Sequence, residues 1–147
     1  MDWSRLFPKI EKDYTGSKIP FYFLILIAIV STIRSLIHVI APDGGAHSIA
    51  GIDVTVQGGA NIIAIFAQWG ALQLLLALFY WLAIFRYRFL VPAMLAVVVM
   101  EQLFRMGAGQ LKPLEISSPP PGAIESEVLL PIAVVAFLWS LYRNPKK

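Results

Sequence analysis

Residues 89–111 form an apolar stretch that is long enough to cross a lipid bilayer, yet they include Glu101, Gln102 and Arg105. A charged side chain in the hydrocarbon region costs about 2.5 to 3.5 kcal/mol on insertion scales, so such residues normally face other protein or a wet cavity. We therefore expect this segment to be one helix of a larger membrane protein, with its polar face turned away from lipid.

The composition also indicates a protein that is solvated by lipid. Hydrophobic residues make up 58% of the chain and charged residues 14%, whereas about 25% of the residues of a soluble domain are charged. The chain has no cysteine, which excludes disulfides and thiolate metal sites. No run of Lys and Arg interleaved with aromatic residues offers a groove for a phosphate backbone, so nucleic acid is not an expected partner. No cofactor and no metal site are expected.

Four apolar stretches have about the 20 residues that a membrane-spanning helix needs, and they lie at residues 19–40, 58–85, 89–111 and 123–142. The fold class is therefore all-α, an integral membrane four-helix bundle with up-and-down topology. Arg86, Tyr87 and Arg88 form a tight charged turn, which makes the second and third helices antiparallel neighbours.

The connections also carry turn and helix-start signals. The first loop begins with a Pro-Asp-Gly-Gly turn and continues either as a short interfacial strand or as an extended loop. Pro92 either kinks the third helix or starts it. The three prolines Pro119–Pro121 cannot continue a helix and predict a stiff connector before the fourth one.

The chain ends predict the orientation in the membrane. Residues 1–18 place hydrophobic side chains on one stripe of a helix beside lysines, which is typical of a short amphipathic helix in the headgroup layer. Residues 143–147 form a basic tail. Most Lys and Arg near helix ends gather on this side, and the opposite loops contain only Lys112. The positive-inside rule then places both termini in the cytoplasm, at the plasma or inner membrane.

Polar residues from all four predicted helices fall in one band of depth. A helix rises about 1.5 Å per residue, which converts sequence position into depth. The band lies in the outer half of the bilayer and contains Arg34, Gln68, Glu101, Arg105 and Glu127. Its two arginines and two glutamates balance in charge. We expect a hydrogen-bonded cluster in which Arg34 reaches Glu101, with His38 and Gln68 at its rim.

This band supplies the candidate site residues. Glu101 is a candidate general acid or base toward an apolar substrate, with His38 as its proton relay. The residues expected to bind a ligand are Arg34, Gln68, Trp69, Gln102, Arg105 and Glu127. The alternative reading is a structural ion-pair network that fixes which helix faces which.

Other polar residues are expected to be structural. His38 has no second membrane histidine with which to form a bis-histidine metal or haem site, so a hydrogen-bonded role is favoured. His47 lacks a recognised ligand spacing and is interpreted as a surface loop residue. A stripe of small residues on the second helix is expected to allow close approach of a neighbouring helix, and it consists of Ala60, Ala64, Ala67 and Ala71. Gln68 lies on or near this stripe, whereas Gln73 is expected to point elsewhere.

The outer ends of the third and fourth helices carry a recognisable order of features. An arginine near the end of the third helix is followed by Gly-x-Gly, a Pro-rich loop and a carboxylate that opens the fourth helix; these residues are Arg105, Gly107, Gly109, Pro119–Pro121 and Glu125 or Glu127. This pattern resembles the broad DoxX-like group of small membrane proteins. The resemblance implies a four-helix up-and-down bundle with cytoplasmic termini, and roles as varied as oxidoreductase subunit and receptor-assembly factor.

The leading functional hypothesis is a small binding or accessory membrane protein. Its outer-half polar pocket would receive a lipidic ligand or a partner helix, and its partners would be membrane lipids and either an apolar small molecule or a partner membrane subunit. One alternative is an intramembrane isomerase, hydrolase or cyclase that uses Glu101. A second is a small transporter, which is disfavoured because the inner half of the helices has no matching polar residues.

Overall fold

The computed structural model describes residues 13–114 and 121–142. Residues 1–12 of the amphipathic segment expected at 1–18, residues 115–120 of the Pro-rich connector and the basic tail at 143–147 lie outside the described residues. Residues 13–17, the described part of the amphipathic segment before α1, are not helical. Within the described ranges the protein is helical and has no strand, which confirms the all-α class. Four of its helices are long and apolar enough to cross a membrane.

The helices begin and end within two residues of the predicted ranges. They are α1 (Lys18–Ile40), α2 (Gly59–Phe85), α3 (Val91–Leu111) and α4 (Pro121–Ser140), and a 3₁₀ turn, η2 (Arg88–Leu90), leads into α3. Pro92 lies in the first turn of α3 and therefore starts the helix. Pro121 is the first residue of α4, a position where the missing N–H of proline has no intrahelical partner to lose.

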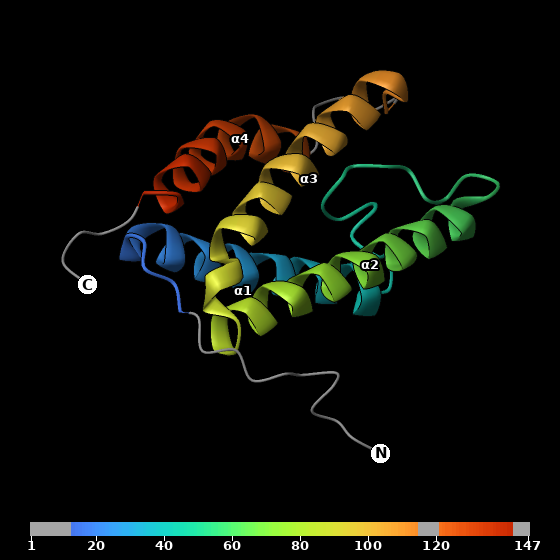
Figure 1. The fold of residues 1–147 in the computed structure, drawn as a ribbon. Helices are drawn as coiled ribbons and strands as arrows, with labels where there is room; N and C mark the ends of the chain where they lie inside the picture. The colour runs from blue at the N-terminus through green and yellow to red at the C-terminus, as the bar shows by residue number, and fades with distance from the viewer. Residues whose placement is uncertain (1–12, 115–120, 143–147) are drawn as a thin grey trace, which may run out of the picture.

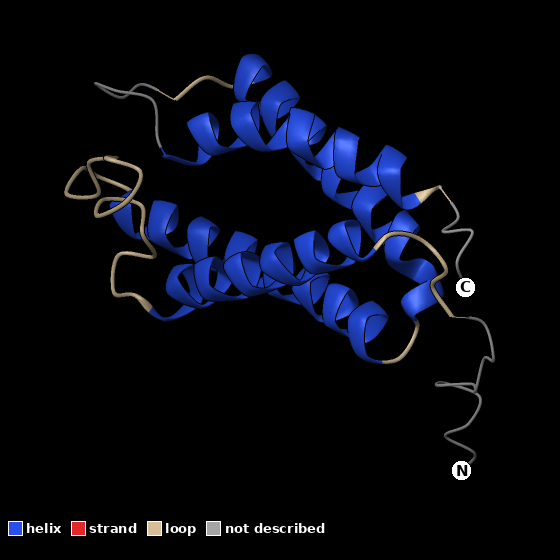
Figure 2. Cartoon of the chain, turned by 90° about the vertical axis from the view of Figure 1, so that its left-hand side faces the viewer, coloured by secondary structure: helices blue, strands red, loops and turns tan. Residues whose placement is uncertain are grey.

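The four helices are arranged as two antiparallel pairs. Helix α1 packs along α2 and α3 packs along α4, with far fewer contacts between the pairs (Figure 1). The pairs meet near the end that holds the chain termini and diverge toward the opposite end (Figure 2). The up-and-down order agrees with the prediction, but the molecule is two hairpins joined at one end and not four evenly packed helices.

A common hydrophobic core joins the two pairs. It contains buried residues of all four helices, among them Leu24, Ile84, Leu95 and Ala133. At the same end the chain before α1 meets the end of α4, because the Tyr14 hydroxyl donates to the carbonyl oxygen of Ser140 at 3.5 Å. The end that closes the molecule is therefore the end at which both termini lie.

The seam between α1 and α2 depends on a glycine. A side-chain carbon added to Gly70 would lie 2.5 Å from Cβ of His38 and 3.1 Å from the carbonyl oxygen of Ser35. The buried face of α2 continues at helical spacing through Gln73, Ala77 and Tyr80. The expected alanine stripe is wrong as a contact face, because Ala60, Ala64 and Ala71 are exposed and Ala67 is only half-buried.

The first loop begins with turns in residues 41–50, and its remaining residues 51–57 contain no strand. Its turn is held by Asp43, whose carboxylate oxygens accept from the backbone N–H groups of Gly45 at 2.9 Å and Ser48 at 2.6 Å. These hydrogen bonds hold the pKa of Asp43 well below its usual range, because they stabilise the charged form. The turn is thereby fixed against the outer end of α1.

The close approach at Gly70 predicts opposite effects for two glycine-to-alanine substitutions. Gly70→Ala should lower the stability by about 1 to 3 kcal/mol, because α1 and α2 must separate to admit the methyl group. Gly107→Ala is the matched control in α3: nothing lies within 4 Å of its added carbon, and the better helix propensity of alanine should leave stability unchanged or raise it by up to about 1 kcal/mol. Thermal unfolding of both variants in detergent would measure this difference, and equal midpoints would contradict it.

Candidate functional site

The polar cluster is centred on Arg34 of α1. One guanidinium nitrogen of Arg34, Nη1, lies 2.7 Å from Oε2 of Glu125 on α4, and Nη2 lies 3.7 Å from Oε1 of Glu101 on α3. The side chains of Arg34 and Glu101 are 18% and 15% exposed and that of Glu125 is 34% exposed. The expectation that Arg34 reaches Glu101 is confirmed, but the shorter contact is with Glu125.

Helix α2 supplies two further partners of Glu101. The amide nitrogen of Gln73 donates to Oε1 of Glu101 at 3.0 Å, and the hydroxyl of Tyr80 donates to Oε2 at 3.4 Å. Gln73 points elsewhere than the mostly exposed alanine stripe, as expected, but its contact with Glu101 was not predicted. Gln73 and Tyr80 are seven residues apart, which is two helical turns, so both lie on the same face of α2. That spacing was the sequence signal that could have identified them.

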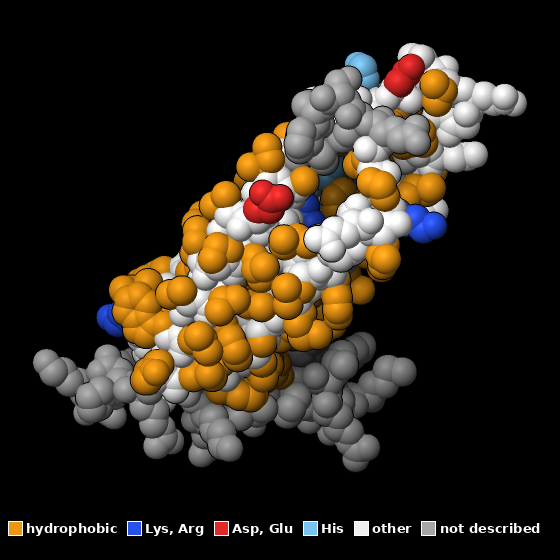
Figure 3. Space-filling view, turned by 90° about the horizontal axis from the view of Figure 1, so that it is seen from above, with side chains coloured by type: hydrophobic (Ala, Val, Ile, Leu, Met, Phe, Trp, Pro, Cys, Tyr) orange, Lys and Arg blue, Asp and Glu red, His pale blue; other side chains and the backbone are white. Residues whose placement is uncertain are grey.

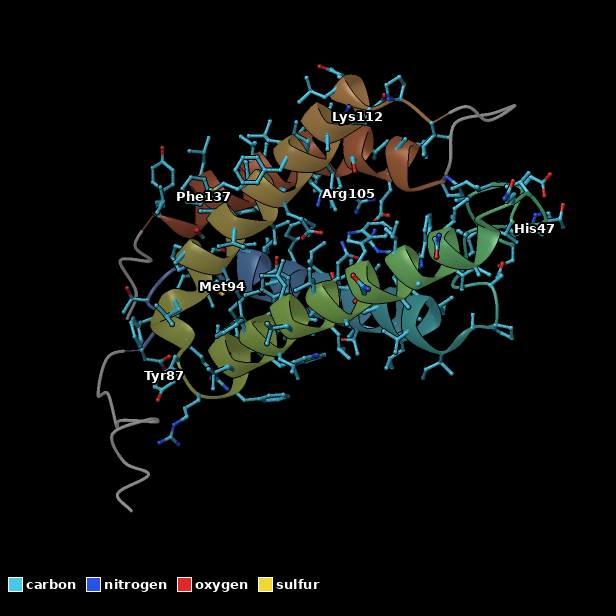
Figure 4. All side chains as sticks on the ribbon, turned by 90° about the vertical axis from the view of Figure 1, so that its right-hand side faces the viewer. His47, Tyr87, Met94, Arg105, Lys112 and Phe137 are labelled. Atoms are coloured by element: carbon cyan, nitrogen blue, oxygen red, sulfur yellow. The ribbon has the colours of Figure 1, made fainter. Side chains whose placement is uncertain are left out.

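Arg105 joins the cluster from α3. Its Nη2 donates to the carbonyl oxygen of Gly122 at 3.1 Å, and its guanidinium carbon lies 5.6 Å from the centre of the Trp69 ring. In Figure 4, Arg105 lies on the side of the α3 and α4 pair that faces α2, whereas Lys112 lies at the outer end of α3. The first of these contacts ties α3 to the start of α4, and the second is a cation–π contact with α2.

His38 fixes the outer end of α1 and packs on Trp69. Its Nδ1 lies 2.7 Å from the carbonyl oxygen of Gly44. A carbonyl oxygen only accepts, so Nδ1 carries the proton and donates it. The His38 ring is 4.9 Å from the Trp69 ring between centres and 5.7 Å from that of Phe66. The hydrogen bond expected of His38 is therefore present, and it anchors the first loop.

The structure does not bring Gln68, Glu127 or His47 into the cluster. Gln68 and Glu127 are exposed, and no hydrogen bond or ion pair joins either to another described residue. Glu127 is two residues from Glu125, and residues two apart on a helix point in nearly opposite directions. His47 lies in the first loop at the far end of the molecule from Tyr87 (Figure 4).

Several buried polar atoms around the cluster have no hydrogen-bond partner among the described residues. They are Nε of Arg34, Oε1 of Gln73, Oε1 of Gln102 and Nη1 of Arg105, and Ser35 contributes a fifth such atom, its Oγ. Gln102 and Gln73 are almost fully buried, with 2% and 7% of their surface exposed. A buried polar group without a partner costs about 1 to 3 kcal/mol, so the unpartnered atoms of Arg34, Gln73 and Arg105, all of which belong to the cluster, require an explanation.

The cluster lies beneath an otherwise apolar surface. Seen from above, the described surface is mostly hydrophobic, and it is hollowed where a Lys or Arg side chain is visible below it (Figure 3). Large hydrophobic side chains such as Phe104, Ile65 and Ile124 are exposed on the outer faces of α2, α3 and α4. The cluster is therefore a polar site that is reached from an apolar environment.

This arrangement favours binding chemistry. Within the described ranges, no group of three or more His, Cys, Asp or Glu could hold a metal ion. Glu101 already accepts hydrogen bonds on both oxygens, from Gln73 and Tyr80, and it also pairs with Arg34. The unused groups of the cluster are hydrogen-bond donors and acceptors that a ligand could satisfy.

Comparison with protein-family models, with curated proteins and with solved structures finds no match to this chain. The functional argument therefore rests on the residues of the site.

Removing Arg34 should disrupt the contact between the helix pairs. Arg34→Gln leaves Glu101 and Glu125 without their ionic partner, and we expect a loss of stability of about 2 to 4 kcal/mol, somewhat less than for a fully buried ion pair. Glu127→Gln is the matched control: it also removes one charge, but from an exposed position, and should change stability by less than about 0.5 kcal/mol. Thermal unfolding in one detergent would compare the stabilities of the two variants. An Arg34→Gln protein as stable as wild type would show that these ion pairs do not hold the two helix pairs together.

Proposed function

We propose that this protein is a small integral membrane binding protein that holds a lipidic ligand in the recess between its two helix pairs. The observation that carries the proposal is the set of unpartnered donors and acceptors around Arg34 and Arg105, in a molecule whose outer surface is apolar. Binding sites for small molecules are typically apolar with a few polar groups that fix the orientation of the ligand. A ligand that supplies the missing partners would remove the cost of burying these atoms.

A lipidic ligand fits the recess better than a partner helix. The two pairs diverge only toward the end opposite the termini, and at the other end they share one core that contains Leu24, Ile84 and Ala133 (Figure 2). A membrane-spanning partner helix is about 30 Å long and needs a groove along the whole bilayer. Because the pairs share a core at one end, a shorter molecule suits the site better than a helix that spans the bilayer.

The rival function, an intramembrane enzyme that uses Glu101 as acid or base, has less support. Gln73, Tyr80 and Arg34 all contact the carboxylate of Glu101, and His38 donates its Nδ1 proton to Gly44. No described contact links His38 to Glu101, so the expected proton relay lacks its connection. A transport path is disfavoured as well, because the closed end of the molecule is a hydrophobic core.

We further propose that both termini lie in the cytoplasm, at the plasma or inner membrane. The end that holds the termini also carries Lys18, Arg86 and Arg88, and the positive-inside rule assigns this end to the cytoplasm. The recess then opens toward the outer leaflet. The resemblance to the DoxX-like group belongs to the same proposal; Arg105, one residue of that pattern, donates to Gly122, which follows the Pro-rich loop.

The proposed function predicts that a lipidic molecule stays with the protein through purification. Protein extracted in a mild detergent and separated by size should carry about one such molecule per chain, which lipid extraction and mass spectrometry would identify. A stoichiometric second polypeptide in place of a small molecule would contradict the proposal and indicate a subunit. Retention of only bulk phospholipid, in the proportions of the source membrane, would also contradict it.

The proposed orientation predicts which loops are accessible from outside the cell. The chain has no cysteine, so single cysteines can be introduced without removing others. Gln57→Cys, in the first loop, should react with a membrane-impermeant maleimide in intact cells, whereas Thr15→Cys should react only after permeabilisation. Both positions are exposed, so accessibility on the protein itself is matched. The reverse labelling pattern would contradict the proposal and show that both termini lie outside the cell.

A further inference from the structure

We propose that the ligand of this recess is an uncharged amphiphile of the acylglycerol class, with a headgroup that carries both hydroxyl groups and a carbonyl oxygen. The proposal rests on the proposed function and deepens it, because it names the headgroup chemistry that the unpartnered atoms select. Three features constrain the chemistry of the ligand: the unpartnered atoms, the charge balance of the cluster and the aromatic side chains beside it.

The unpartnered atoms include both donors and acceptors. Nε of Arg34 and Nη1 of Arg105 can only donate, so they require oxygen acceptors such as a carbonyl or a hydroxyl. The amide oxygen of Gln73 accepts, so it requires a donor, which a hydroxyl supplies and a carboxylate or phosphodiester does not. Both arginines are half-buried as residues while these two nitrogens are buried, so a ligand oxygen reaches them only where the guanidinium group turns toward it.

The charge of the cluster is already balanced. Two positive side chains, Arg34 and Arg105, lie beside two negative ones, Glu101 and Glu125, and these four groups interact electrostatically. An anionic headgroup would add an uncompensated negative charge in an apolar environment, and an ammonium group would add a positive one. An uncharged headgroup satisfies the hydrogen bonds without this cost.

The wall of the site fits an apolar chain next to a polar headgroup. The rings of Trp69 and Phe66 pack edge to face with their centres 5.8 Å apart, beside His38. Trp69 also lies under the guanidinium group of Arg105, so a headgroup bound at Arg105 has an aromatic surface beside it for the first carbons of its chain. The remaining chain would extend between the diverging helix pairs toward the surrounding acyl chains.

The test compares amphiphiles that share one acyl chain and differ in headgroup charge. Wild-type protein in phosphatidylcholine nanodiscs would be titrated at pH 9 with radiolabelled monooleoylglycerol, oleate or oleoyl lysophosphatidate. We expect saturable binding of monooleoylglycerol near one per chain, and an affinity about tenfold or more above that of either anion. Monooleoylglycerol should also raise the thermal unfolding midpoint, because it binds the folded state.

Two substitutions on α3 locate the bound headgroup. Arg105→Gln removes an unused donor and should weaken monooleoylglycerol binding about tenfold. Lys112→Gln removes the same charge from an exposed position at the end of the helix and should leave the affinity within about twofold. The comparison of headgroups on wild-type protein does not depend on either variant, so it stands even if Arg105→Gln fails to fold.

The outcomes separate the ligand class from the proposed function. Tighter binding of oleate or lysophosphatidate would overturn the uncharged headgroup and leave the lipid-binding function in place. Equal weakening by Arg105→Gln and Lys112→Gln would overturn the assignment to this recess. If none of the three binds saturably while a different lipid co-purifies at one per chain, the acylglycerol class is wrong. If no amphiphile binds and no lipid co-purifies, both the acylglycerol class and the proposed lipid-binding function are wrong.

Discussion

The contacts of Arg34 with Glu101 and Glu125 are the interaction on which the open half of the molecule depends. Arg34 belongs to the α1 and α2 pair and both glutamates belong to the α3 and α4 pair, so among the described residues these ion pairs join the two halves where they diverge. At the other end a hydrophobic core does the same. In an apolar surrounding an unpaired charge is costly, so the cluster holds the pairs in one register.

The shape of the recess follows from the unequal packing of the four helices. Gly70 lets α1 and α2 approach so closely that His38 and Ser35 lie against the backbone of α2. The pair packs as one layer, and α3 and α4 form the other. The two layers share a hydrophobic core at one end and the ion-pair cluster further along. This arrangement leaves a polar site that is flanked by apolar surfaces. This combination is the basis of the proposed ligand-binding function.

Much of the cluster could be expected from the sequence, because charged residues in apolar helices must find each other. Arg34 and Glu101 were predicted to meet on depth alone, and they do. Depth does not give the direction in which a side chain points, however. Glu125 and Glu127 differ by only about 3 Å in depth but face opposite sides of α4, and only Glu125 reaches Arg34. The hydrogen bond from Gln73 was missed for the same reason, since helix rotation decides it.

The sequence by itself determined four apolar helices of spanning length, their order, and a shared depth for the polar residues, since hydropathy and helical rise are local properties of the chain. Only the tertiary structure decided that the helices pair two by two and which face of α2 is buried. It also decided which polar atoms stay without partners. Those features depend on the rotation of each helix about its axis, and that rotation is set by packing against neighbours that lie far away in the sequence.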